Sequence, residues 1–152
     1  MVDANQISND IHKKMAIDLF NKTWDYLDKK NRTEADNVEM IHTAHASRYH
    51  WGQVGKPLEF QRGEWQISRV YAVLEMGESA LYHGEIALKF CQEEGIGDFD
   101  LAFAYEAITR AYSIMKNNSE KEKYLAFAKE AGQKISEEGN RDYFFSELET
   151  IS

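Results

Sequence analysis

A single proline, Pro57, occurs among the 152 residues of the chain. Proline lacks a backbone N–H and its ring clashes with the preceding helical turn, so a chain nearly free of proline can form long uninterrupted helices. Apolar residues recur every three to five positions along most of the sequence, which is the spacing of one helix face. No stretch shows the sustained alternation of a half-buried strand. The sequence therefore predicts an all-α fold.

Capping and turn residues divide the chain into about seven helices. Thr33 with Asp36 resembles a capping box, Pro57 suits a first helical turn, and Asp98 suits an N-cap. The expected helices run over residues 7–30, 34–53, 57–75, 78–94, 99–116, 120–138 and 141–150. Because their connections are short, neighbouring helices should lie antiparallel. We expect one domain, composed of a helical hairpin over 1–55, two helical pairs over 57–138 and a capping helix over 140–152.

Charge and cysteine content exclude several classes of protein. The chain has 26 acidic and 18 basic residues, a formal net charge of −8, which argues against a nucleic-acid-binding protein. The one cysteine, Cys91, excludes a disulfide framework and a four-thiolate zinc site, and we expect it to be an inert buried thiol. The N-terminal sequence lacks a signal-peptide pattern and no apolar run is long enough to span a membrane. A cytoplasmic location without membrane contact is the expectation.

Two segments of the chain resemble the tetratricopeptide repeat (TPR). The matching positions are Ile67, Tyr71, Ala80 and Ala87-Leu88 and, more loosely and with an offset of 41 residues, Ile108, Tyr112 and Ala128. The resemblance covers about residues 61–132, departs from the usual period of about 34 residues, and leaves residues 1–55 out of register. It implies a stack of helical hairpins whose first helices line a concave surface. The segments 45–51, 62–74 and 95–107 also resemble uncharacterised bacterial helical proteins, which implies no chemistry.

A groove on the first helix of each pair is the first candidate site. The TPR resemblance implies that its lining includes Arg62, Trp65, Arg69, Glu106 and Arg110. Arginine binds carboxylates and phosphates through two parallel hydrogen bonds, and a tryptophan face can stack on a side chain. The first hypothesis is a protein- or peptide-interaction module that binds an acidic segment in this groove. In the alternative interpretation, Arg69, Glu106 and Arg110 form an ion-pair network that only fixes the register of the helices.

Three histidines on one expected helix form the second candidate site. The residues are His42, His45 and His50, with His12, His83 and Glu64 as ligands from elsewhere in the chain. The spacing H-x-x-H can direct two imidazoles to one metal ion, although the motif H-E-x-x-H is absent. The second hypothesis is therefore a small metal-binding enzyme or sensor. In the alternative, these histidines are hydrogen-bonding or surface residues.

No motif in the sequence predicts a catalytic residue or a cofactor. The loop from Gly95 to Asp100 lacks a phosphate-loop pattern, and G-x-S-x-G is absent, so a binding role is favoured over an enzyme. The third hypothesis is a structural protein that self-associates, as a homodimer, through the last helix. The apolar residues of that helix are Tyr143, Phe144, Phe145 and Leu148, and the alternative is that they pack onto the preceding helix.

Overall fold

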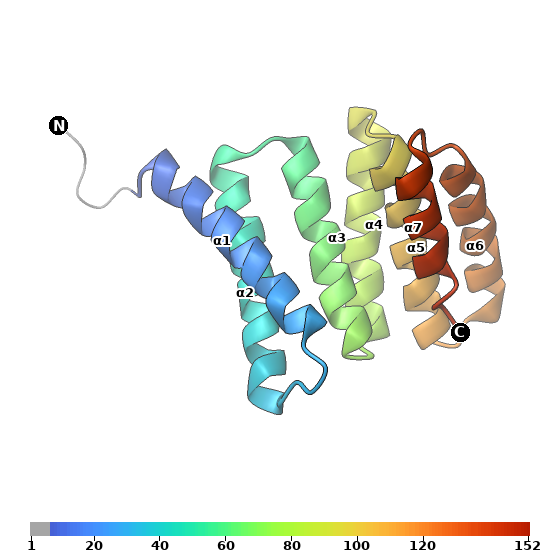
Figure 1. The fold of residues 1–152 in the computed structure, drawn as a ribbon, viewed down its shortest axis with the longest axis horizontal. Coiled ribbons are helices and arrows are strands. Elements are labelled where there is room, and N and C mark those ends of the chain that lie inside the picture. The colour runs from blue at the N-terminus through green and yellow to red at the C-terminus, as the bar shows by residue number, and fades with distance from the viewer. Residues whose placement is uncertain (1–6) are drawn as a thin grey trace.

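The chain forms seven α-helices and no strand in the computed structural model, which describes residues 7–152 (Figure 1). The helices are α1 (Asn9–Asp28), α2 (Glu34–Val54), α3 (Pro57–Val73), α4 (Gly77–Glu94), α5 (Asp98–Ile114), α6 (Asn118–Gln133) and α7 (Glu138–Leu148). The predicted all-α class and the predicted number of helices are confirmed. None of these helices is both long enough and apolar enough to span a bilayer.

The start of α2 forms as its sequence predicts. The backbone N–H of Asp36 donates to the Thr33 hydroxyl at 3.1 Å, and the backbone N–H of Thr33 donates to the Asp36 carboxylate at 3.0 Å. These two bonds satisfy two of the N–H groups that lack a partner within the helix. Pro57 is the first residue of α3, where its missing N–H costs no helical hydrogen bond.

Three later helix starts differ from the prediction. Gly97, not Asp98, is the N-cap of α5, and the Asp98 carboxylate accepts from the backbone N–H of Ser136 at 3.3 Å. Helix α6 begins at Asn118 instead of the expected residue 120, and Asn117 caps it by accepting a bond from the Glu120 N–H at 3.2 Å. The last helix begins at Glu138, so Gly139 lies inside it. Each correction shifts a helix start by one to three residues.

Consecutive helices pair as hairpins that stack in a row. Helices α1 and α2, α3 and α4, and α5 and α6 form the three hairpins, and α7 packs on α5 and α6 (Figure 1). Helix α3 also contacts α1 and α5, and α5 contacts α7, whereas the backbones of α2, α4 and α6 do not approach one another. Helices α1, α3, α5 and α7 therefore lie next to one another and form the concave, inner side of a curved stack.

Small side chains at the helix contacts bring the hairpins close together. Ala80, Ala87, Ala104 and Ala111 all have 0% of their surface exposed. These small residues of α4 and α5 therefore lie in the core, where they permit close helix axes. Cys91 also lies in this core, and burial raises the pKa of its thiol to about 12, consistent with the predicted inert role.

Candidate functional site

Glu106 on α5 is the centre of an ion-pair network on the concave side. Its side chain is 0% exposed, and one carboxylate oxygen accepts from Arg69 of α3 at 3.2 Å and from Arg110 at 2.7 Å. Arg69 also donates to Glu147 of α7 at 3.2 Å. Burial acts to lower the pKa of Arg69, but the carboxylates of Glu106 and Glu147 outweigh it and hold that pKa above its usual value. The Arg69 guanidinium thus stays charged inside the protein.

Helix α7 covers this network. Arg110 donates to the Glu147 carbonyl at 3.1 Å and to the Thr150 hydroxyl at 2.8 Å. The side chains of Arg69 and Arg110 are only 14% and 17% exposed. The structure therefore contains the ion-pair network that the sequence offered as the alternative to a binding role. Two of the three candidate arginines, Arg69 and Arg110, are therefore largely covered.

Arg62 differs from the other two arginines because its side chain is 54% exposed. Its Nε and one terminal nitrogen donate to the two oxygens of Asp100 at 3.0 and 3.1 Å, which joins α3 to the start of α5. The hydrogen bond to Asp100 raises the pKa of Arg62 above its usual value. This paired geometry holds the guanidinium in a fixed orientation at the surface.

Trp65 lies at the meeting point of four inner helices. Its indole N–H donates to the Phe103 carbonyl of α5 at 3.0 Å, and its ring stacks on Trp24 of α1 with centroids 6.0 Å apart. The guanidinium of Arg69 lies 5.0 Å from the centre of the Trp65 ring. Of the five predicted groove residues, Arg62 and Trp65 reach the open surface described next, while the network holds Arg69, Glu106 and Arg110.

A pocket of about 160 Å³ opens between the inner helices, and we refer to it as the aromatic pocket. Its lining comprises Phe20 and Trp24 of α1, Gln61, Arg62 and Trp65 of α3, Phe99, Asp100 and Phe103 of α5, and Tyr143 of α7. Arg62 and Trp65 were predicted to line the groove, whereas the other aromatic side chains of this pocket were not. These aromatic residues could have been predicted from the sequence, because large aromatics are concentrated on the first helix of each hairpin.

A second pocket, of about 170 Å³, adjoins the first towards the start of α1, and we call it the end pocket. It is lined by Ile17, Phe20, Asn21, Trp51, Glu59 and Arg62. Phe20 and Arg62 belong to both pockets, so the two form one surface. All three tryptophans of the chain line this surface. Partly buried tryptophans that line a concave surface are typical of a binding site.

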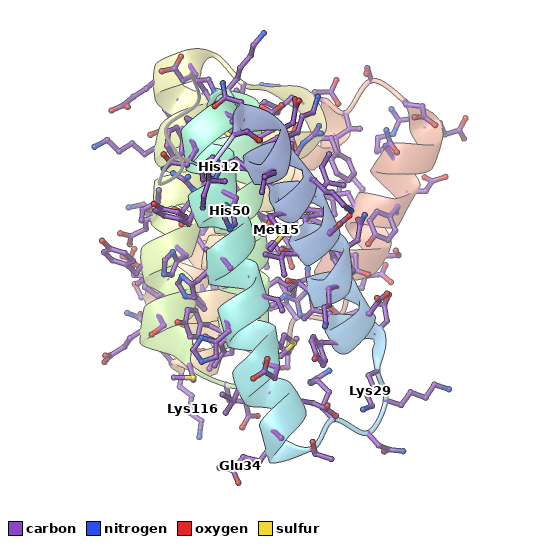
Figure 2. All side chains as sticks on the ribbon, turned by 90° about the vertical axis from the view of Figure 1, so that its left-hand side faces the viewer. His12, Met15, Lys29, Glu34, His50 and Lys116 are labelled. Carbon is purple, nitrogen blue, oxygen red and sulfur yellow. The ribbon has the colours of Figure 1, made fainter. Side chains whose placement is uncertain are left out.

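The candidate histidines separate into different contacts. The Nδ1 atoms of His50 and His12 lie 2.8 Å apart, at the end of the stack that Figure 2 shows. His45 instead pairs with the Tyr71 hydroxyl at 2.9 Å, and His42 takes part in neither contact. Within residues 7–152, no group of three or more His, Cys, Asp and Glu side chains is placed to hold a metal ion. The predicted set of His42, His45 and His50 therefore does not converge on one site.

A second polar cluster joins α2, α3 and α4 near His45. Glu64 accepts from Arg48 at 3.1 Å and contacts Nδ1 of His83 at 2.7 Å. Burial, followed by the nearby His83, holds the pKa of His45 below its usual value. None of these side chains lines either pocket described above. The cluster joins the three helices, and it lies outside both pockets.

The last helix uses most of its apolar surface inside the molecule. Phe144 is 0% and Leu148 is 6% exposed, and both belong to one core cluster with Ile135 and Phe103. Tyr143 is 49% exposed and lines the aromatic pocket. This packing agrees with the capping alternative for α7 and leaves little apolar area there for self-association.

No protein-family model, no curated protein and no solved structure matches this chain. The resemblance to the tetratricopeptide repeat accordingly remains an expectation. The function proposed below is supported by the pockets, charges and packing of the chain itself.

Proposed function

We propose that this protein is a binding module for a polypeptide segment, which it holds through a bulky apolar side chain in the aromatic pocket. The convergence of Trp24, Trp65, Phe103 and Tyr143 from four helices carries this proposal. Ligand sites are concave and mostly apolar, with a few polar groups that fix orientation. Large apolar side chains anchored in such pockets supply most of the free energy of many protein interfaces.

We propose that Arg62 binds an acidic residue of the segment, next to the apolar side chain in the pocket. A guanidinium has five N–H groups, and the bonds to Asp100 use two of those of Arg62. Since Arg62 lines both pockets and is half exposed, a carboxylate of the bound segment would extend the existing ion pair. Arg69, Glu106 and Arg110 contribute indirectly, because their network holds α3, α5 and α7 together around the aromatic pocket.

A preformed pocket favours binding because less conformational freedom is lost when the ligand arrives. Trp65 is fixed by its indole hydrogen bond and by the Arg69 guanidinium over its ring. Arg62 is fixed by Asp100.

We propose a cytoplasmic setting, supported by the single buried thiol of Cys91. We also propose a protein partner, supported by the net charge of −8, which disfavours nucleic acid.

Selection from a random-sequence peptide library on the purified full chain tests the proposal. Tyr143→Lys places a long cationic side chain at the mouth of the aromatic pocket, so the selected peptides should bind this variant at least about tenfold more weakly, a loss of about 1.4 kcal/mol. The matched control is Tyr82→Lys on α4, because Tyr82 is 64% exposed and lies outside both pockets. Equal affinity of the peptides for the Tyr143 variant and the parent chain would contradict the proposal.

A further inference from the structure

A pair of histidines joins α1 to α2 at the open end of the stack, away from the aromatic pocket. His12 of α1 and His50 of α2 approach through equivalent ring atoms, with the two Nδ1 atoms 2.8 Å apart (Figure 2). Their ring centroids are 5.1 Å apart and the ring planes meet at 47°. At most one of the two nitrogens carries the proton of this contact, because two protonated nitrogens would repel each other.

The pair can present two neutral imidazole nitrogens to one metal ion. A histidine binds a metal through a neutral imidazole nitrogen. In the contact between the two rings, one Nδ1 atom carries the proton and the other accepts it. When that proton moves to Nε2 of the same ring, which is the other neutral tautomer, both Nδ1 atoms have a lone pair for a metal ion.

The spacing of the two nitrogens indicates which coordination geometry fits. Two neighbouring ligands at a right angle, each about 2.0 Å from the ion, lie about 2.8 Å apart, whereas tetrahedral ligands at that bond length lie about 3.3 Å apart. The distance in the structure is 2.8 Å. It matches the square-planar or tetragonal arrangement preferred by Cu²⁺ and Ni²⁺ rather than the tetrahedral arrangement of Zn²⁺.

We propose that His12 and His50 form a binding site for a divalent transition-metal ion of tetragonal preference, with Cu²⁺ bound more tightly than Ni²⁺. The order of the two ions follows the general series of metal affinities. Water would complete the coordination, since residues 7–152 offer no group of three or more side-chain ligands in one place. The site does not depend on the proposed peptide binding, because neither histidine lines the aromatic pocket or the end pocket.

Calorimetric titration of the full chain with Cu²⁺ tests this inference. The parent chain should bind one ion per chain, and His12→Gln and His50→Gln should each weaken binding at least about tenfold. His42→Gln is the matched control, because His42 lies on α2 with His50 but outside the pair, and its affinity should equal that of the parent. The double variant His12→Gln/His50→Gln measures any binding by the N-terminal amine.

Two further measurements separate loss of the site from loss of the fold. Circular dichroism shows whether each variant is folded, and the melting temperature with Cu²⁺ should rise for the parent and for His42→Gln but not for His50→Gln. Electron paramagnetic resonance of the copper complex should show coupling to two imidazole nitrogens. Parent affinity no higher than that of the double variant, or an equal loss in the His42 control, would overturn the proposal.

Discussion

Glu106 lies in the predicted binding groove, but in the structure it pairs with Arg69 and Arg110 inside the protein. A buried carboxylate is unfavourable unless cations and hydrogen bonds compensate it. Arg69 and Arg110 both bond one oxygen of Glu106, while the other oxygen is buried without a hydrogen-bond partner in the described structure. The spacing of Glu106 and Arg110 predicted their pairing. Glu147, which completes the network, lies too far along the chain to be predicted from local spacing.

Glu106→Gln should destabilise the protein by about 3 kcal/mol, because the neutral amide leaves two poorly exposed guanidinium groups without their shared charge partner. Urea unfolding followed by circular dichroism measures the change. Glu130→Gln is the matched control, since Glu130 also pairs with a cation four residues away, Lys134, but is 68% exposed. That control should change stability by less than about 0.5 kcal/mol. Equal stability of the two variants would contradict the buried network.

The lowered pKa of His45 should make the folded protein less stable in mild acid. Its pKa in the folded chain is held below the ordinary histidine value of 6.5, first by burial and then by His83. Between these two pKa values the unfolded chain takes up a proton that the folded chain does not, so stability falls as the pH drops below 6.5. Above that pH this histidine makes no pH-dependent contribution.

Urea unfolding at several pH values, on the parent and on His45→Gln, measures this effect. Gln keeps a polar group opposite the Tyr71 hydroxyl but cannot titrate, so the variant should lose less stability than the parent as the pH falls below 6.5. An identical pH dependence in the two proteins would show that His45 does not contribute as described.

At the scale of the helices, the contact of α6 with α7 depends on Gly132. A Cβ atom at Gly132 would lie 2.7 Å from Cδ1 of Phe144 and 2.9 Å from Cζ of Phe145, which is too close for carbon atoms. The glycine therefore lets the Phe144 ring approach the α6 backbone and complete the core beneath α7. The same approach places Tyr143 at the aromatic pocket and Glu147 at the ion-pair network.

Gly132→Ala should destabilise the protein by about 1–3 kcal/mol, because the clash with two phenylalanine rings outweighs the gain of about 1 kcal/mol in helix propensity. Gly139→Ala is the control within α7, where a Cβ meets only the end of the Glu137 side chain at 3.1 Å. Thermal unfolding should show a lower melting temperature for the first variant and no loss for the second. A stabilised Gly132 variant would mean that α7 packs differently.

The helices themselves could be predicted well from the sequence because their signals are local. Apolar periodicity, the Thr33 capping box and Pro57 all act within one or two turns. The starts of α5 and α6 were less predictable, since more than one residue near each start could be the N-cap. At α5 the choice involves a contact with Ser136, nearly forty positions away, which no local pattern reveals.

At the scale of the whole molecule, the aromatic pocket was only partly predictable. The groove hypothesis singled out Arg62 and Trp65, which line the aromatic pocket, but it named no lining residue from α1 and did not include α7. The region containing Trp24 did not follow the repeat register, and α7 was considered only as a cap or a dimer contact. The pocket exists only when four helices are assembled, so its full set of residues is a property of the tertiary structure.

The assembled charges also change the interpretation of the groove. Arg62, Arg69 and Arg110 pair with Asp100, Glu106 and Glu147, so three cations meet three anions and the cluster is close to neutral. An attraction for acidic partners therefore depends on Arg62 alone, the exposed member of the set. Apolar contact in the aromatic pocket becomes the main expected source of affinity.

The most direct test of the central claim is an NMR titration of the tryptophan indole N–H signals with a library-selected peptide. Assignment uses Trp→Phe variants of the three tryptophans. We predict saturable shifts of the Trp24 and Trp65 signals, because both rings line the aromatic pocket, and an unchanged backbone signal for Phe127 on α6, outside both pockets. A peptide that binds while leaving Trp24 and Trp65 unshifted would place the binding surface elsewhere and contradict the account.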